Sequence, residues 1–231
     1  MRNIVAGNSF DYLYEHGKAV LAAGHPFYSC SNEKFISDPL FRTDAWTIDM
    51  VCGKQVTTPA GDKVRYNVFP GEMRSAVRSA AEAGINLIVS GAYIATDNED
   101  CIYPIPADSA YRAEAKAFAK EVLGYRYVTG QASRRGAVKP VANKAVSGHQ
   151  RVQIVKEMNP EKYCVESVDG ISPATKSGQV IYRYAENDIP AAVAHQGAGY
   201  RCVSFGFPIE AIESEENINN LISTTLEYLK K

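Results

Sequence analysis

The sequence predicts an α/β protein with a doubly wound, mostly parallel sheet and a small antiparallel β insert. Short apolar runs, typical of buried strands, alternate with segments of helical periodicity in the first half of the chain and at its end. Glycines follow several of these runs, as tight strand-to-helix turns require. A chain of 231 residues is long enough to bury a sizeable core, so we expect one domain over residues 1–231.

In the first half of the chain, strands and helices alternate. The segments 11–23 and 71–83 carry small and apolar residues on one helical face, and a glycine follows each segment, as is common at helix C-termini. Apolar runs at 46–52 and 85–89 are typical of buried strands. The expected elements are, in order, a strand at 4–6, a helix at 11–23, a short strand at 27–30, a strand at 46–52, a helix at 71–83 and a strand at 85–89.

The second half of the chain changes pattern. A loop is expected at 97–106, which holds two prolines and several acids, and a helix is expected from Asp108 or Ser109 to Leu123. From 125 to 194 the chain has only short β-like runs separated by Gly, Pro, Asn and Ser, and these predict the antiparallel insert. The runs lie at 125–129, 152–155, 163–165, 179–184 and 191–194.

The last helix is the clearest element in the sequence. Ser214 is its expected N-cap, two glutamates follow in the first turn, and a single apolar stripe continues to Leu229. Such a stripe predicts a helix that covers one face of the sheet. We expect strands at 4–6, 48–51, 87–89 and 203–205 to share that sheet, with helices on both faces.

Composition excludes several classes of function. The net charge is −1 with acids and bases interspersed, so we expect no nucleic-acid partner. No apolar run approaches a membrane span, and the first seven residues are too short and too soon polar to form a signal peptide. The five cysteines are scattered, with no Cys-x-x-Cys pair and no cluster with histidine. We therefore expect no metal site and no cofactor, and interpret the cysteines mainly as buried small residues.

Two positions suggest a catalytic architecture without its catalyst. The strand that ends at Gly206 is followed by Phe207, Pro208 and, just beyond, Glu210. This order resembles the point at which class I glutamine amidotransferases carry the His-Pro-Glu part of their catalytic triad. Phenylalanine has no titratable group and cannot take a proton from a nucleophile.

The matching nucleophile position is also altered. Residues 85–95 read as a buried strand that enters a tight turn, which is how a nucleophile elbow is built. Amidotransferases carry Gly-x-Cys-x-Gly there, and aligning Gly91 with the first glycine places Tyr93 at the cysteine and Ala95 at the second glycine. A tyrosine of ordinary pKa near 10 is a poor nucleophile at neutral pH without a base.

Four motifs together resemble one family. They are Gly7-Asn-Ser-Phe-Asp-Tyr12 with His16-Gly-Lys18, Cys52-Gly-Lys-Gln-Val-Thr-Thr-Pro59, Val89-Ser-Gly-Ala-Tyr-Ile-Ala-Thr-Asp97 and Gly206-Phe-Pro-Ile-Glu210. The chain is similar over nearly its whole length to the class I glutamine amidotransferase-like segment of large secreted bacterial proteins labelled putative xanthan lyase or N-acetylmuramoyl-L-alanine amidase. In them this segment sits among fibronectin type III-like and golvesin-like modules.

The resemblance implies a setting. The expected partners are neighbouring modules of the same polypeptide and an acidic polysaccharide, and the expected location is secreted, periplasmic or at the cell surface. Segments of this family usually begin earlier, so we expect Met1 to open part of a longer protein. The family labels belong to other modules or are transferred, so they do not show that this domain cleaves anything.

The predicted ligand site lies where parallel strands end, because ligands of such sheets bind outside the carboxyl ends of the strands. Small residues there let a ligand approach the backbone, and Lys54 favours an acidic sugar or another carboxylate. The site comprises Asn8, Cys52, Gly53, Lys54, Gly91, Ala92 and Tyr93. An alternative interpretation is that these are ordinary strand-to-helix turns.

Weaker candidates for chemistry remain. Lys54 and a helix N-terminus would lower the pKa of the Cys52 thiol, but a Cys–His pair needs His16, His149 or His195 to arrive through the fold. We interpret Asp97, Glu99, Asp100 and Asp108 as a solvated acidic loop, and Arg134, Arg135 and Lys139 as a small basic patch. Tyrosines at 103, 111, 125, 127, 182 and 184 suit either an exposed sugar-binding face or half-buried strands.

Two classes of function follow. The first is a non-catalytic binding or scaffolding module of a secreted polysaccharide- or cell-wall-processing protein. The second is an enzyme with an unrecognised site, either a hydrolase that uses Cys52 or a lyase that uses Tyr93 with Lys54. The double substitution at Tyr93 and Phe207 favours the first class.

Overall fold

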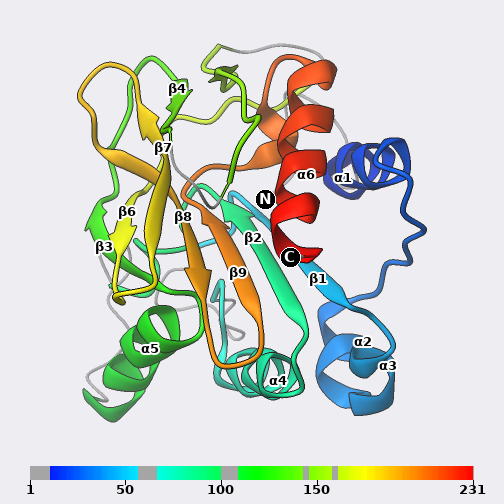
Figure 1. The fold of residues 1–231 in the computed structure, drawn as a ribbon. Helices are drawn as coiled ribbons and strands as arrows, with labels where there is room; N and C mark the ends of the chain where they lie inside the picture. The colour runs from blue at the N-terminus through cyan, green and yellow to red at the C-terminus, as the bar shows by residue number, and fades with distance from the viewer. Residues whose placement is uncertain (1–10, 57–66, 100–108, 143–145, 158–160, 231) are drawn as a thin grey trace.

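The computed structural model describes residues 11–56, 67–99, 109–142, 146–157 and 161–230 (Figure 1). Its main element is a seven-stranded sheet with the order β1-β2-β9-β8-β7-β4-β5, and a two-stranded sheet, β3-β6, lies beside it. The strands are β1 (Thr47–Gly53), β2 (Asn86–Gly91), β3 (Tyr125–Thr129), β4 (Ala137–Pro140), β5 (Val152–Gln153), β6 (Gly170–Pro173), β7 (Gln179–Tyr184), β8 (Pro190–Gln196) and β9 (Arg201–Phe205).

The prediction of a doubly wound, mostly parallel sheet of flavodoxin type is wrong. Only β1, β2 and β9 run parallel to one another, whereas β8, β7, β4 and β5 are each antiparallel to the strand before them in the order. The segment expected to form a small insert therefore supplies four strands of the main sheet. The physical reason lies at the β8–β9 hairpin, because the few residues between Gln196 and Arg201 cannot make the long crossover that a parallel pair needs.

Helices cover both faces of the β1-β2-β9 region. The helices α1 (Asp11–Ala22) and α6 (Glu215–Lys230) pack together on one face, where Figure 1 shows α6 lying across the sheet beside α1. The helices α4 (Gly71–Glu82) and α5 (Ser109–Glu121) pack on the other. Alternation along β2 matches this arrangement, since Ile88 belongs to the α6 side of the core, and Leu87 and Val89 belong to the α4 side.

The predicted strands at 48–51, 87–89 and 203–205 lie in one sheet, as expected, and the predicted strand at 4–6 lies outside the described residues. The expected strand at 27–30 is not formed. It is followed by two short helices, α2 (Asn32–Ser37) and α3 (Pro39–Thr43), which the sequence analysis missed. Their signals were present: Ser31 and Asp38 accept backbone N–H bonds as N-caps, and Pro39 opens α3.

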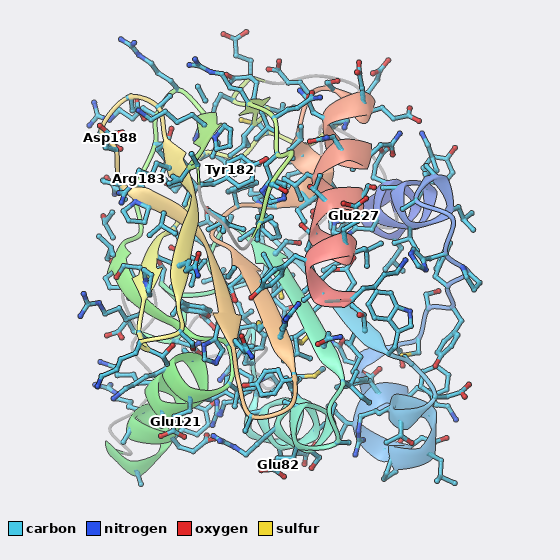
Figure 2. All side chains as sticks on the ribbon, in the orientation of Figure 1. Glu82, Glu121, Tyr182, Arg183, Asp188 and Glu227 are labelled. Carbon is cyan, nitrogen blue, oxygen red and sulfur yellow. The ribbon has the colours of Figure 1, made fainter. Side chains whose placement is uncertain are left out.

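The hairpin of β7 and β8 shows why this half of the sheet is stable. Tyr182 and Tyr184 are fully buried, and their hydroxyls donate to the carbonyl oxygens of Gln150 and Asp169. Arg183 lies at the outer rim of the hairpin, where its guanidinium donates to the Asp188 carbonyl oxygen at 2.7 Å (Figure 2). Two of the tyrosines considered for an exposed sugar-binding face are thus core residues, and Tyr125 is a third.

Candidate functional site

The ends of β1 and β2 meet as the predicted site requires. Gly53 is the register partner of Gly91, and the Ala92 N–H donates to the Gly53 carbonyl oxygen at 2.8 Å. A Cβ at Gly91 would lie 2.8 Å from the Cβ of Cys52, closer than real Cβ contacts come, so only glycine allows this approach. The structure therefore brings Cys52, Gly53, Gly91 and Ala92 together; Asn8 lies outside the described residues.

The backbone donors that follow β2 are already occupied. The carboxylate of Asp169 accepts from the N–H groups of Ala95 at 2.6 Å and Thr96 at 2.9 Å, and it also bonds the Thr96 hydroxyl. Burial raises the pKa of Asp169 to about 7, while these hydrogen bonds act in the opposite direction. Backbone N–H groups in such a turn can bind an anion, but here the N–H groups of Ala95 and Thr96 already bind the Asp169 carboxylate. They are therefore not available to a ligand.

Lys54 is also engaged within the chain. Its ammonium group forms an ion pair with Glu166, donates to the Cys164 carbonyl oxygen at 2.9 Å and lies 6.0 Å from the centre of the Tyr163 ring. Glu166 offsets the positive charge that was expected to select an acidic sugar. The predicted ligand preference therefore has little electrostatic support at this position.

Neither predicted nucleophile is activated. Burial raises the pKa of the Cys52 thiol far above its ordinary value, and the nearby carboxylates of Glu210 and Asp49 raise it further. Burial, followed by the charges of Glu166 and Asp169, raises the pKa of Tyr93 to about 12. Both groups are protonated at neutral pH.

Phe207, which the sequence resemblance placed at the base position of a triad, is a core side chain. Phe207 is fully buried, and its ring makes edge contacts with Phe205 at 5.6 Å and Tyr182 at 6.3 Å between ring centres. It leads into the short 3-10 helix η1 (Ile209–Ala211), which carries Glu210. The hydrophobic contacts explain the residue as part of the core, with no role in proton transfer.

A buried histidine–carboxylate cluster, which the sequence analysis missed, lies beside these strand ends. It consists of His16 on α1, Asp49 on β1, Glu210 on η1 and Tyr163. The imidazole Nδ1 lies 2.6 Å from Asp49 Oδ2, and Nε2 lies 3.3 Å from Glu210 Oε2. The Tyr163 hydroxyl donates to Glu210 Oε1 at 2.8 Å. One histidine thus ties a helix to the strand β1 and to the turn after β9.

The cluster holds its histidine protonated. Desolvation lowers the pKa of His16, but the Coulombic attraction and hydrogen bonds of Asp49 and then Glu210 outweigh it and raise the pKa to about 10. An imidazolium at neutral pH donates from both nitrogens and cannot serve as a general base. Both ring nitrogens of His16 are bound to carboxylates, and Cys52 packs against the α4 side of the sheet, so no Cys52–His16 pair is formed.

Gly53 allows the cluster to sit against the strand end. Its φ of +53° is in the left-handed region, and a Cβ there would lie 3.3 Å from the Tyr12 ring and 3.4 Å from Glu210 Oε1. Only two features of the sequence indicated this cluster: the His16-Gly-Lys18 motif, and Glu210 in the Gly206-Phe-Pro-Ile-Glu motif. No local sequence pattern predicts that His16 contacts Glu210, because 194 positions separate the two residues.

Among the polar atoms that have no hydrogen-bond partner within the described part of the chain, one belongs to the cluster and another lies on the neighbouring strand β2. They are Asp49 Oδ1 and the Ser90 hydroxyl, both buried. In the parallel register Asp49 pairs with Ile88 and Val51 pairs with Ser90, so both atoms belong to the face of the sheet that α1 covers. The described residues contain no group of three or more His, Cys, Asp or Glu side chains arranged to hold a metal ion.

A polar hollow of about 400 Å³ lies apart from this cluster, at the turn that holds Arg134 and Arg135. Glu186 accepts hydrogen bonds from the backbone N–H groups of Arg134 and Arg135, at 2.6 and 3.4 Å. The backbone donors of this turn are therefore bound within the chain. The third member of the predicted basic patch, Lys139, pairs with Asp188 at 2.6 Å.

The structure also places the acidic residues of the predicted loop and the cysteines. Asp97 is not a solvated acid, because it is buried and accepts the Val68 N–H at 2.9 Å. Glu99 pairs with Lys116 at 2.6 Å, while Asp100 and Asp108 lie outside the described residues. Cys202 is buried as expected, but Cys30 is exposed. No described helix is long and apolar enough to span a membrane.

Comparisons with known proteins show the fold alone. No family model and no curated protein matches the sequence. Among solved structures, the exo-β-1,4-mannosidase Op5Man5 from Opitutaceae bacterium strain TAV5 has a similar fold, with a TM-score of 0.54 and 12% identity. The match covers 95% of this chain and 31% of the mannosidase chain, so the protein spans about a third of the length of that enzyme.

Proposed function

We propose that this chain is a non-catalytic, polysaccharide-binding module of a larger secreted protein that processes polysaccharide or cell wall. One observation carries the proposal: the two positions at which the sequence predicted a nucleophile and its base hold Tyr93 and the buried core residue Phe207, which has no titratable group. Glu210, at the predicted carboxylate position, accepts a hydrogen bond from His16 of α1.

The remaining ionisable groups support the same conclusion. The Cys52 thiol and the Tyr93 hydroxyl have raised pKa values, and the His16 imidazole is held as a cation between two carboxylates. Nucleophilic catalysis needs a group with a lowered pKa or an adjacent free base. The described residues around the strand ends offer neither, which gives no support to the alternative of an enzyme built on Cys52, Lys54 and Tyr93.

The carbohydrate setting is inferred from two sources. The chain resembles segments of secreted polymer-processing proteins, and its fold matches part of a chain named as a mannosidase. The matched region makes up 31% of the mannosidase chain. This is consistent with the proposal that the present chain is one module of a longer polypeptide. Fold similarity at 12% identity does not transfer the activity, so the proposal concerns binding.

The test measures activity and binding on the same preparation. The purified chain should release no ammonia from glutamine and no sugar from β-1,4-mannohexaose or xanthan, while its mobility in a native gel should fall when xanthan or mannan is cast in the gel. Product formation that Tyr93→Phe or Cys52→Ala abolishes would establish an enzyme instead. Unchanged mobility in every polysaccharide gel would reject the binding role.

A further inference from the structure

The polar hollow of about 400 Å³ has more basic than acidic residues in its lining. Residues 131–135 of the turn after β3 form one wall, and Glu186 and Asn187 from the tip of the β7–β8 hairpin form the other. Figure 2 labels Arg183 and Asp188 of the same hairpin. Two arginines and one glutamate are the charged residues of the lining. A hollow with an excess of positive charge attracts anions.

The backbone of the turn that carries the two arginines is held in place from several sides. The Asn187 side-chain amide donates to the Ala132 carbonyl oxygen at 2.8 Å, and the Lys156 ammonium donates to the Ser133 carbonyl oxygen at 2.9 Å. The Gly136 N–H donates to Ser133 Oγ at 2.8 Å, and a φ of +73° at this glycine closes the turn. Because the backbone is fixed before a ligand arrives, binding costs less conformational entropy.

The glutamate of the hollow is bound mainly to the backbone of the same turn. Glu186 Oε1 accepts the N–H groups of Arg134 and Arg135, and a hydrogen bond from the Ser133 hydroxyl is the largest cause that lowers the pKa of Glu186. Its other oxygen, Oε2, lies 3.9 Å from Arg135 Nε, and the Arg135 side chain is 83% exposed, so water screens this ion pair. Glu186 therefore neutralises the two guanidinium groups only in part.

Arg134 differs from the other basic residues of this region in having no side-chain partner among the described residues. Lys139 pairs with Asp188 at 2.6 Å, and the Arg183 guanidinium donates to the Asp188 carbonyl oxygen at 2.7 Å. A guanidinium group carries five N–H donors and no acceptor. The Arg134 donors are therefore available to a ligand, whereas the charges of Lys139 and Arg183 are already engaged.

We propose that Arg134 and Arg135 form a binding site for the carboxylate groups of an acidic polysaccharide, an inference that rests on the proposed function. A guanidinium group binds a carboxylate through two parallel N–H···O bonds, and two adjacent arginines offer two such donor pairs. Gln131, which also lines the hollow, has an amide that donates to and accepts from sugar hydroxyls. The lining thus offers charged donors for the carboxylate and a neutral amide for the sugar ring.

The composition of the lining favours an acidic sugar over a protein or a nucleic acid. The residues that line the hollow include no aromatic and no large apolar side chain, whereas the centre of a protein interface relies on such anchors. Nucleic acids need an extended basic surface, and the net charge of this chain is −1. A carboxylated sugar needs partners only for its charge and its hydroxyls, and these are the groups that the lining contains.

Chemical reduction of the carboxyl groups of xanthan isolates their contribution to binding. Calorimetric titration of the purified chain with xanthan oligosaccharides should give a Kd about tenfold lower than titration with the same oligosaccharides after carboxyl reduction. The difference should shrink in 0.5 M NaCl, because salt screens exposed charges. Equal affinities for the two forms would overturn the carboxylate site, while the proposed polysaccharide binding would stand.

Variants locate the contact. The double variant Arg134→Gln, Arg135→Gln should bind native xanthan oligosaccharides about tenfold more weakly and leave the affinity for the reduced form within about twofold. Lysine at both positions keeps the charge without the planar donor pair and should restore the affinity only in part. These changes leave the backbone bonds to Glu186 in place, and thermal melting verifies that each variant is folded.

The matched control is Arg126→Gln. Arg126 is an exposed arginine of β3 that does not line the hollow. Its replacement should leave the affinity for native xanthan oligosaccharides within about twofold. A loss as large as that of the double variant would show that binding depends on overall charge, which would overturn the site.

Three further outcomes would overturn the proposal. Wild-type affinity for native xanthan in the double glutamine variant would place the carboxylate elsewhere without affecting the proposed function. Absence of binding by the wild type to native xanthan, reduced xanthan and mannan would reject the proposed function and this site with it. Polyphosphate that binds more tightly than xanthan and loses its affinity in the double variant would replace the carboxylated sugar with a phosphate ligand.

Discussion

The side chains of His16 and Glu210 lie 3.3 Å apart although 194 positions separate them in the chain. His16 comes from α1, and Glu210 comes from the turn that follows β9. The second imidazole nitrogen reaches Asp49 of β1, so one ring holds three elements together. Because the group is buried and charged, its contribution depends on both carboxylates remaining paired.

Replacing the histidine should therefore destabilise the fold strongly. His16→Gln leaves Asp49 and Glu210 close together without a cation, and we expect the free energy of unfolding at pH 7 to fall by about 3 kcal/mol or more. Urea denaturation measures the change. The matched control is Lys18→Gln on the same helix, which removes a partly exposed ion pair with Glu215 and should change stability little. Equal effects of the two variants would contradict a special role for the cluster.

The same pair predicts a pH dependence. The pKa of His16 is about 10 in the folded chain and has an ordinary value of 6.5 when the chain is unfolded. The folded state binds this proton more tightly, so the stabilisation is fully present below pH 6.5 and is lost as pH rises through 10. The difference in unfolding free energy between wild type and His16→Gln should shrink between pH 7 and pH 10. A constant difference over that range would show that His16 is not protonated.

Asp169 should be a second buried stabilising residue. Its carboxylate accepts the buried N–H groups of Ala95 and Thr96, which no other described group accepts. Asp169→Ala leaves these donors unsatisfied and should lower the free energy of unfolding by about 2 kcal/mol. Asp44→Ala, which changes an exposed aspartate in the right-handed helical region (φ −80°), is the control. Retained stability in Asp169→Ala would mean that water replaces the carboxylate.

The effect of Gly17→Ala on stability should change sign when Phe27, whose ring lies against Gly17, is also replaced. Gly→Ala inside a helix normally stabilises by about 1 kcal/mol, but here the new Cβ would overlap the Phe27 ring. We expect Gly17→Ala to destabilise the wild type and to stabilise a Phe27→Ala background. Thermal melts of the four proteins give the coupling energy. Additive effects would show that Phe27 does not rest on α1.

Much of the fold could be predicted where the pattern is local. The strands at 48–51, 87–89 and 203–205 and the last helix follow from apolar periodicity and capping, and Ser214 does accept the Asn217 N–H at 3.3 Å. The direction of the strands between 125 and 194 depends on which edge they join, and periodicity carries no such information. The mixed sheet could therefore not be derived from strand patterns alone.

The site was less predictable for the same reason. The sequence placed Gly53 and Gly91 together at the ends of two parallel strands, and the structure pairs them in register. The partners of Lys54 and Cys52 come from distant segments, and they reverse the expected chemistry of both residues: Glu166 pairs with the lysine, and Glu210 helps to keep the thiol protonated. The sequence left the later tyrosines open between an exposed face and half-buried strands. The structure buries Tyr125, Tyr182 and Tyr184, whereas Phe27, Tyr28 and Trp46 are exposed.

The last helix supplies the clearest test of the core. Leu226 of α6 is 4% exposed and belongs to the hydrophobic cluster that includes Val203 and Phe205 of β9. Leu226→Ala empties a buried site that the surrounding strands can fill only in part, so we expect a loss of about 2 to 5 kcal/mol in the free energy of unfolding. Leu40→Ala removes a leucine that is 83% exposed and should change stability by less than about 0.5 kcal/mol. Equal melting temperatures for the two variants would mean that the apolar stripe of α6 does not pack on the sheet in solution.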